Sequence, residues 1–379
     1  MFRWIPLSLF IYVWLRLVLP LPLGLPAKAA LAAALCAASL KQQFFTSAGG
    51  DFFSPELPQR LIEFYGIAFG ALFLLFVLTL LKDILLTVLF LGRLFLPSVP
   101  RISCSAGAAL VFAVVAVSAA AYGTYEAQRL PRVHETEVSL PGLPPEFDGF
   151  KIVLLSDIHI SASRRAGYAE ALVKRVGALS PDIVLIAGDF IDGTVRDRSA
   201  DIAPLAGLSA PGGVYGVLGN HEYYFNAGEW KSFIEDSLGI KILLNEHAMI
   251  ERGGENIAVA GVADLAAGRF ANAEAPDAQK ALAGVPESVT KIMLDHQPSA
   301  AKRNAAAGAD LQLSGHTHGG MVPGLSAVVR KFNGGFVNGW YDVAGMKLYV
   351  SPGTGIWNGF LLRLGVPAEI TAMRLSSAR

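Results

Sequence analysis

Apolar residues are distributed very unevenly along this chain of 379 residues. Long apolar runs fill its first third, whereas short apolar runs alternate with polar turns after the proline-rich stretch 141–145. A helix of about 20 apolar residues can cross the hydrocarbon layer of a bilayer, so the two parts are expected to fold in different solvents. We therefore expect a transmembrane anchor region over 1–128, a linker over 129–148 and a globular domain over 149–379.

The anchor region is expected to form about four transmembrane helices. The expected spans, of which the second is the shortest, are 5–25, 27–42, 61–81 and 104–123. The first run follows Arg3 and could instead be a cleavable signal peptide, but the three further runs favour a multi-pass protein. Arg93 and Arg101 favour a cytoplasmic loop after the third span, which would place the globular domain on the outer face, whereas Arg129 and Arg132 oppose this orientation.

Composition excludes several classes of protein. The formal net charge is zero and no long basic run is present, which argues against nucleic acid as a partner. Both cysteines lie in apolar stretches of the N-terminal part, so the polar part has no cysteine-based metal site. The few ionisable residues of the apolar runs can all be placed near a membrane interface, which favours anchoring over transport.

The alternation of strand-like and helical segments in the globular part is typical of a layered α/β domain. Between the first two strand-like runs, apolar residues recur at helical spacing over 166–179. Runs that are apolar on both faces, with helices between them, predict sheets that are covered on each side. The strand-like runs are 151–155, 183–187, 214–218, 257–262, 291–294, 311–313 and 348–350.

Five of these runs end in polar residues of the kinds that bind metals. Because the carboxyl ends of strands in α/β sheets line the ligand crevice, these residues are expected to converge. Five of the seven histidines of the chain fall in these positions. The sequences that follow the five runs are Asp157-Ile158-His159, Gly188-Asp189, Gly219-Asn220-His221-Glu222, Asp295-His296 and Gly315-His316-Thr317-His318.

Each of these residues also has an ordinary structural interpretation. Asp157, Asp189 or Asn220 alone would be a turn or capping residue, and His296 alone would be a buried hydrogen-bonding group. Their conjunction favours a metal site. If the backbone after the first run is extended, Asp157 and His159 share one face. Carboxylate, imidazole and amide donors suit Mn, Fe or Zn.

In this order the five motifs resemble the signature of the calcineurin-like metallophosphoesterase superfamily, over about 150–375. The later run 349–357, followed by Arg363-Leu364-Gly365, is similar to the YkuE/YaeI-like subgroup of bacterial membrane-associated proteins. The chain departs from that subgroup at Met321 and over 358–362, and neither departure touches an expected ligand.

The resemblance implies a four-layer α/β/β/α sandwich with two divalent metal ions and a bridging hydroxide. It implies His221 as general acid or donor to the transition-state oxyanion, with Glu222 either orienting it or starting a helix. Arg164 and Arg165 either bind phosphate or form a solvated pair. The implied ligands are Asp189 as the bridge, Asp157, His159 and His318 for one ion, and Asn220, His296 and His316 for the other.

The function expected from the resemblance is metal-dependent hydrolysis of phosphate mono- or diesters at a bacterial inner or cytoplasmic membrane. A lipid-linked phosphate or pyrophosphate is one candidate substrate, because the anchor would hold the site near a bilayer. The sequence identifies no substrate-binding residues. The alternative is a catalytically inactive relative that binds a ligand or signals from the membrane.

Overall fold

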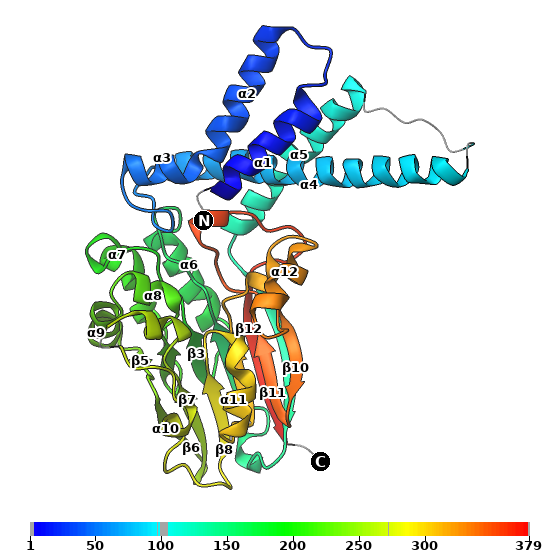
Figure 1. The fold of residues 1–379 in the computed structure, drawn as a ribbon. Coiled ribbons are helices and arrows are strands. Elements are labelled where there is room, and N and C mark those ends of the chain that lie inside the picture. The colour runs from blue at the N-terminus through cyan, green and yellow to red at the C-terminus, as the bar shows by residue number, and fades with distance from the viewer. Residues whose placement is uncertain (1–3, 97, 99–104, 272, 378–379) are drawn as a thin grey trace. The chain divides into compact units, whose positions relative to one another are not determined.

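The computed structural model describes residues 4–96, 98, 105–271 and 273–377, which divide into two compact units (Figure 1). The smaller unit is helical and comprises Met1–Tyr125 together with the distant segment Asn358–Leu362. The larger unit contains both sheets and comprises Glu126–Trp357 and Arg363–Arg379.

Two described helices of the chain are long and apolar enough to cross a membrane, judged by length and composition. They are α4 and α5, with 37 and 23 residues. The apolar helices that correspond to the expected spans 5–25 and 27–42 are shorter, because Pro20 and Pro22 end the first one early. The structure therefore supports two of the four expected spans; position 104, where the fourth was expected to begin, lies outside the described residues. The bounds are α1 Ile5–Val13, continued by a π-helical turn Trp14–Val18, α2 Leu25–Ser39, α3 Lys41–Ala48, α4 Gln59–Phe95 and α5 Ala106–Gln128.

The segment Asn358–Leu362 packs among the helices of the smaller unit. The Phe360 ring lies edge-on to Phe69 and Phe73, with centroid distances of 6.1 and 5.4 Å. The Lys41 ammonium is buried and donates to the backbone oxygens of Asn358 and Gly359, at 2.9 and 3.3 Å. This segment is one of the two places where the sequence departs from the subgroup pattern.

The larger unit contains two six-stranded sheets. In the first, β2 to β5 run parallel, β12 is antiparallel to β2, and β1 is parallel to β12. In spatial order its strands are β1 Arg132–Leu140, β12 Glu369–Ser377, β2 Lys151–Leu155, β3 Ile183–Ala187, β4 Val214–Val217 and β5 Lys241–Ile242.

The second sheet has a parallel centre, β11-β9-β8-β7, and an antiparallel strand at each edge. Its strands, in spatial order, are β10 Gly339–Val343, β11 Met346–Val350, β9 Leu311–Ser314, β8 Thr290–Leu294, β7 Glu255–Gly261 and β6 Glu246–Arg252. The helices of this unit are α6 Ala166–Gly177, α7 Val195–Ile202, α8 Asn220–Tyr224, α9 Ala227–Leu238, α10 Ala278–Ala281, α11 Ala301–Ala306 and α12 Leu325–Phe332.

Three apolar clusters give the unit its layers. Side chains such as Ile152 and Leu185 from the first sheet meet Val259 and Ile292 from the second in a buried core between the sheets. The outer face of the first sheet packs on α6 and α9, and the outer face of the second packs on α10 and α11. The arrangement is α/β/β/α, and each inner strand is apolar because both of its faces are buried.

The expected linker over 129–148 is wrong in its central part. Residues Arg132–Leu140 form β1, which pairs along its whole length with the C-terminal strand β12. Phe147, in the following 3-10 turn, is buried in the core between the sheets. The strand was missed because it pairs with residues more than 200 positions away in the chain. The seven strand-like runs and the helix expected over 166–179 all correspond to elements of the structure.

Candidate metal centre

The residues expected to bind metal lie in loops that follow the carboxyl ends of five strands. β2, β3 and β4 supply those at 157–159, 189 and 220, and β8 and β9 supply those at 296 and 316–318. Six of the seven side chains are buried, with at most 5% of their surface exposed, and His316 is half-buried. Polar groups from both sheets are therefore enclosed in one place.

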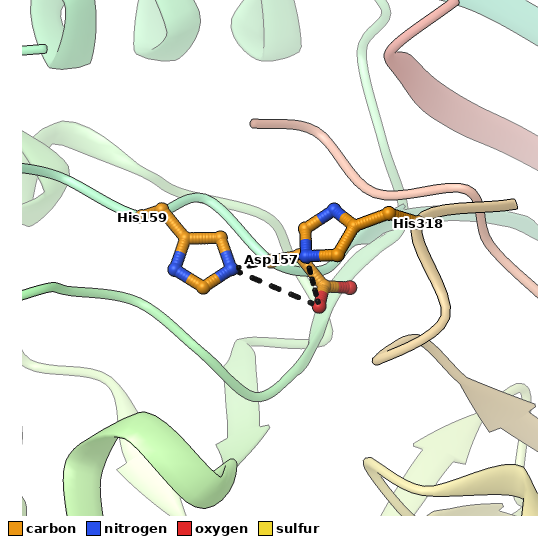
Figure 2. A group of neighbouring side chains, drawn as sticks. All are labelled: Asp157, His159 and His318. Carbon is orange, nitrogen blue, oxygen red and sulfur yellow. Dashed lines mark hydrogen bonds and ion pairs between the residues drawn. The ribbon is translucent and has the colours of Figure 1, made fainter. Parts of the chain in front are cut away.

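Asp157, His159 and His318 form the first cluster of donor atoms (Figure 2). The Nε2 atoms of His159 and His318 lie 4.0 and 3.6 Å from Oδ1 of Asp157. The same two nitrogens are 3.3 Å apart. All three donor atoms lie within 4.8 Å of one another, close enough to share one cation.

Asp189 lies at the centre of two further clusters. Its Oδ2 is 3.2 Å from Nε2 of His296, 3.7 Å from that of His159 and 3.9 Å from that of His221. One cluster comprises Asp189 with His159 and His221, and the other comprises Asp189 with Asp157 and His296. Asp189 thus faces ligands of both expected ions.

Asn220 and His316 lie beside His296. The Asn220 Oδ1 is 3.2 Å from Nε2 of His296. The His316 ring centroid is 5.1 Å from that of His296, and the His316 backbone N–H donates to the Asp157 carboxylate. The structure therefore brings together all seven expected ligands, although His316 is in none of the three clusters of described residues.

The backbone that carries these ligands differs from the expected one. Five of them have a positive φ, the left-handed region that costs non-glycine residues about 1–3 kcal/mol. Asp157 and His159 therefore share a site through two left-handed residues, not through the expected extended strand end. Concentrated strain of this kind is typical of functional sites. The angles are 52° for Asp157, 49° for His159, 54° for Asp189, 70° for His316 and 47° for His318.

The charges of the site fit divalent cations. Asp157 and Asp189 are almost completely buried close to each other, which is unfavourable without positive charge nearby. Burial raises the pKa of Asp157. Burial also favours protonated Asp189, but the imidazoles of His296 and His221 hold its pKa well below the usual range. Burial lowers the pKa of His316 to about 3 and that of His318 well below its ordinary value, and neutral imidazoles can bind metals.

Asp192 is a site residue that sequence reasoning missed. Its Oδ1 accepts from Nδ1 of His159 at 3.0 Å and lies 2.5 Å from Nδ1 of His221. Burial raises the pKa of this carboxyl, but the two histidines outweigh that effect and lower it to about 2. Its only signal in the sequence is its place three residues after Asp189.

His221 is oriented by this contact. With Nδ1 held by Asp192, its Nε2 faces Asp189. Burial lowers the pKa of His221, but Asp189 and Asp192 outweigh burial and raise it to about 9.

Glu222 has a structural role that differs from orienting His221. Its carboxylate accepts from the backbone N–H groups of Gly219 and Asp189 through Oε2, and from those of Phe190 and Ile191 through Oε1. It therefore caps the start of α8 and joins that helix to the loop after β3.

The paired arginines of the first loop separate in the structure. Arg165 is exposed, whereas Arg164 is buried and donates to the His159 backbone oxygen at 3.3 Å, so the expected solvated pair is wrong for Arg164. A second buried arginine, Arg363, donates to the oxygens of Pro352 and Gly355 and lies 3.3 Å from Nδ1 of His318. Arg164 therefore binds the backbone of the first loop, and Arg363 binds the backbone of the loop after β11 and lies beside the His318 ring.

Comparisons with known proteins agree with this geometry. Residues 150–320 match the family model described as Calcineurin-like phosphoesterase. A bovine transmembrane protein with metallophosphoesterase domain is 38% identical over 267 residues, which are 68% of this chain and 60% of the bovine one. An uncharacterized metallophosphoesterase of Aquifex aeolicus is 31% identical over 263 residues, 69% of this chain and 97% of that protein.

The uncharacterized metallophosphoesterase YkuE of Bacillus subtilis is 29% identical over 278 residues, 72% of this chain and 94% of that protein. The resemblance inferred from the five motifs is thus confirmed. The chain spans less than two thirds of the length of the bovine relative.

Proposed function

The chain belongs to the calcineurin-like metallophosphoesterases, and from this premise we propose that it hydrolyses phosphate mono- or diesters with two divalent metal ions. The observation that carries the proposal is the convergence of Asp157, Asp189 and the surrounding histidines from both sheets at one edge. A structural role alone does not explain why two buried carboxylates lie among five imidazoles, with both aspartates and three of the histidines on strained backbone.

Asp189 is proposed as the ligand shared by both ions. Its Oδ2 lies within 3.7 Å of one histidine from each proposed set, His159 and His296. One ion would be completed by Asp157, His159 and His318, and the other by Asn220, His296 and His316. The donors suit Mn, Fe or Zn. When bound, a metal pair of this kind activates water and neutralises charge on the phosphoryl group.

His221 is proposed to donate a proton to the leaving oxygen or a hydrogen bond to the charged phosphoryl oxygens. Asp192 holds its Nδ1 at 2.5 Å, so Nε2 is the atom directed at the reacting group. Water adds to phosphorus and releases one proton to solvent, the ester P–O bond breaks, and the alcohol leaves with the proton that His221 supplies. His221 then regains a proton from solvent.

Membrane association of the chain is supported by the apolar helices α4 and α5 and by the similarity to the bovine transmembrane protein. We propose a multi-pass anchor of about four helices, with the two shorter apolar helices as additional membrane segments, in a bacterial inner membrane. We further propose that the catalytic unit faces the outer side and that the substrate is a lipid-linked phosphate or pyrophosphate.

The test of the proposed function uses the full chain in detergent. With Mn²⁺ added, purified protein is expected to retain about two ions per chain and to hydrolyse p-nitrophenyl phosphate or its bis ester. Asp189→Asn is expected to lose both properties, and Asp342→Asn, which changes an exposed carboxylate, is the matched control. Metal-loaded wild-type protein that hydrolyses neither ester would overturn the proposal and favour an inactive ligand-binding relative.

A further inference from the structure

Two aromatic side chains lie beside His221. The Tyr224 ring centroid is 5.5 Å from that of His221, and the Trp357 ring centroid is 6.5 Å from it. Tyr224 belongs to the same short helix as His221, whereas Trp357 belongs to the loop after β11. The two rings therefore reach the same imidazole from distant parts of the chain.

Both rings are more exposed than the imidazole beside which they lie. Tyr224 is 37% exposed and Trp357 is half-buried, whereas His221 beside them is only 5% exposed. Neither ring is among the side chains that form or pack against the four apolar clusters of the described residues.

Their position relative to the reaction follows from the orientation of His221. Its Nε2 is the atom directed at the ester, since Asp192 holds Nδ1. A leaving group that takes its proton from Nε2 begins next to the imidazole and must extend toward solvent. The expected ligands around His221 are largely buried, whereas Tyr224 and Trp357 are partly exposed rings beside its imidazole.

We propose that Tyr224 and Trp357 contact the leaving group and make the enzyme selective for phosphate esters with an apolar leaving group. This inference rests on the proposed function and adds the substrate class. Aromatic faces gain free energy by removing apolar surface from water and gain little from a hydrated polyol.

The experiment compares n-hexyl phosphate with glycerol 3-phosphate on the full chain in detergent with Mn²⁺. Both esters carry the same phosphate and release an unactivated primary alcohol, so the ratio of their kcat/KM values reports contact with the leaving group. Wild-type enzyme is expected to favour the hexyl ester by about tenfold or more. Trp357→Ala and Tyr224→Ala are each expected to lower this ratio several-fold, chiefly through the hexyl ester.

Further variants separate a ring contact from damage to the site. Tyr224→Phe keeps the ring and is expected to keep the ratio, and Phe332→Ala, which removes a 75% exposed ring, is the control for loss of an aromatic side chain. Inorganic phosphate has no leaving group, so inhibition by phosphate shows whether a variant retains its metal centre. If Trp357→Ala does not retain the centre, Trp357→Leu takes its place in the comparison.

The possible outcomes distinguish the two proposals. No preference in the wild type, or equal losses for both esters in the ring variants, would overturn the aromatic contact and leave the proposed function standing. If wild-type enzyme hydrolyses neither these esters nor the p-nitrophenyl esters, the proposed function itself fails.

Discussion

Asp192 links two of the three histidines that border Asp189, His159 and His221, and its carboxylate is buried between them. Partners of this kind fix the orientation of metal-binding imidazoles, and their loss typically costs about 10–100-fold in metal affinity or activity. The role of Asp192 is therefore to position His159 and His221.

We expect Asp192→Ala to lower kcat and metal affinity by about 10–100-fold, because two ring N–H groups lose their acceptor. Asp192→Asn retains one oxygen and should recover part of both. Metal titration and steady-state kinetics measure these effects. Equal values for Asp192→Ala and wild type would rule out the positioning role.

Glu222 is expected to stabilise the site more than it assists the chemistry. Glu222→Gln would turn an amide group toward two backbone N–H donors, which should cost about 1–3 kcal/mol of unfolding free energy. Thermal unfolding with the metal chelated should show a lower Tm for this variant. Glu287→Gln, at an exposed carboxylate, is the control, and an unchanged Tm for Glu222→Gln would contradict the assignment.

At the scale of elements, the site depends on the close approach of the loops after β2 and β9. A Cβ atom at Gly315 would lie 1.7 Å from Oγ of Ser156 and 2.2 Å from Oδ2 of Asp157. Glycine is required here because of space, since its φ is not in the left-handed region. The loop from the second sheet can therefore reach the first only with no side chain at this position.

Gly315→Ala is expected to displace Asp157 and to abolish binding of a full metal complement, because overpacking of this kind costs about 1–3 kcal/mol or more. Metal content and kcat are the measurements, and a loss of activity above about 100-fold is expected. Gly177→Ala, where a Cβ atom meets nothing within 4 Å, is the matched control. A Gly315→Ala variant with two bound ions and wild-type kcat would contradict this account.

At the scale of the whole molecule, the segment Asn358–Leu362 lies in the chain between two residues that border the site. The chain on either side of this segment carries Trp357, which lies beside His221, and Arg363, which lies beside His318. The buried Lys41 ammonium binds the segment through two carbonyl oxygens. Because the segment is continuous with Trp357 and Arg363, the placement of these two residues depends on how the segment is held.

We expect Lys41→Met to lower both the Tm and kcat/KM of the full chain in detergent, because two buried carbonyls lose their donor at about 1–3 kcal/mol each. Lys28→Met is the control, since Lys28 donates to the exposed backbone oxygen of Leu19. A variant at Lys41 with unchanged Tm and kinetics would show that the segment is held by its aromatic contacts alone.

The sequence by itself predicted the inner strands of this protein and the positions of the residues that are proposed as ligands. Strands such as 151–155 and 183–187 are apolar throughout because both faces are buried, and this pattern is visible locally. The metal-binding residue types follow directly in the chain, so their position at strand ends could also be predicted. The two apolar helices α4 and α5 were likewise evident from length and composition.

Only the tertiary structure decided the features that depend on residues distant in the chain. Residues 132–140 became a strand through pairing with 369–377, and Asp192 became a site residue through the histidines that lie against it. The left-handed backbone of Asp157 and the placement of 358–362 with the helices are of the same kind. Such features follow from contacts between distant segments, and no local pattern of hydrophobicity encodes them.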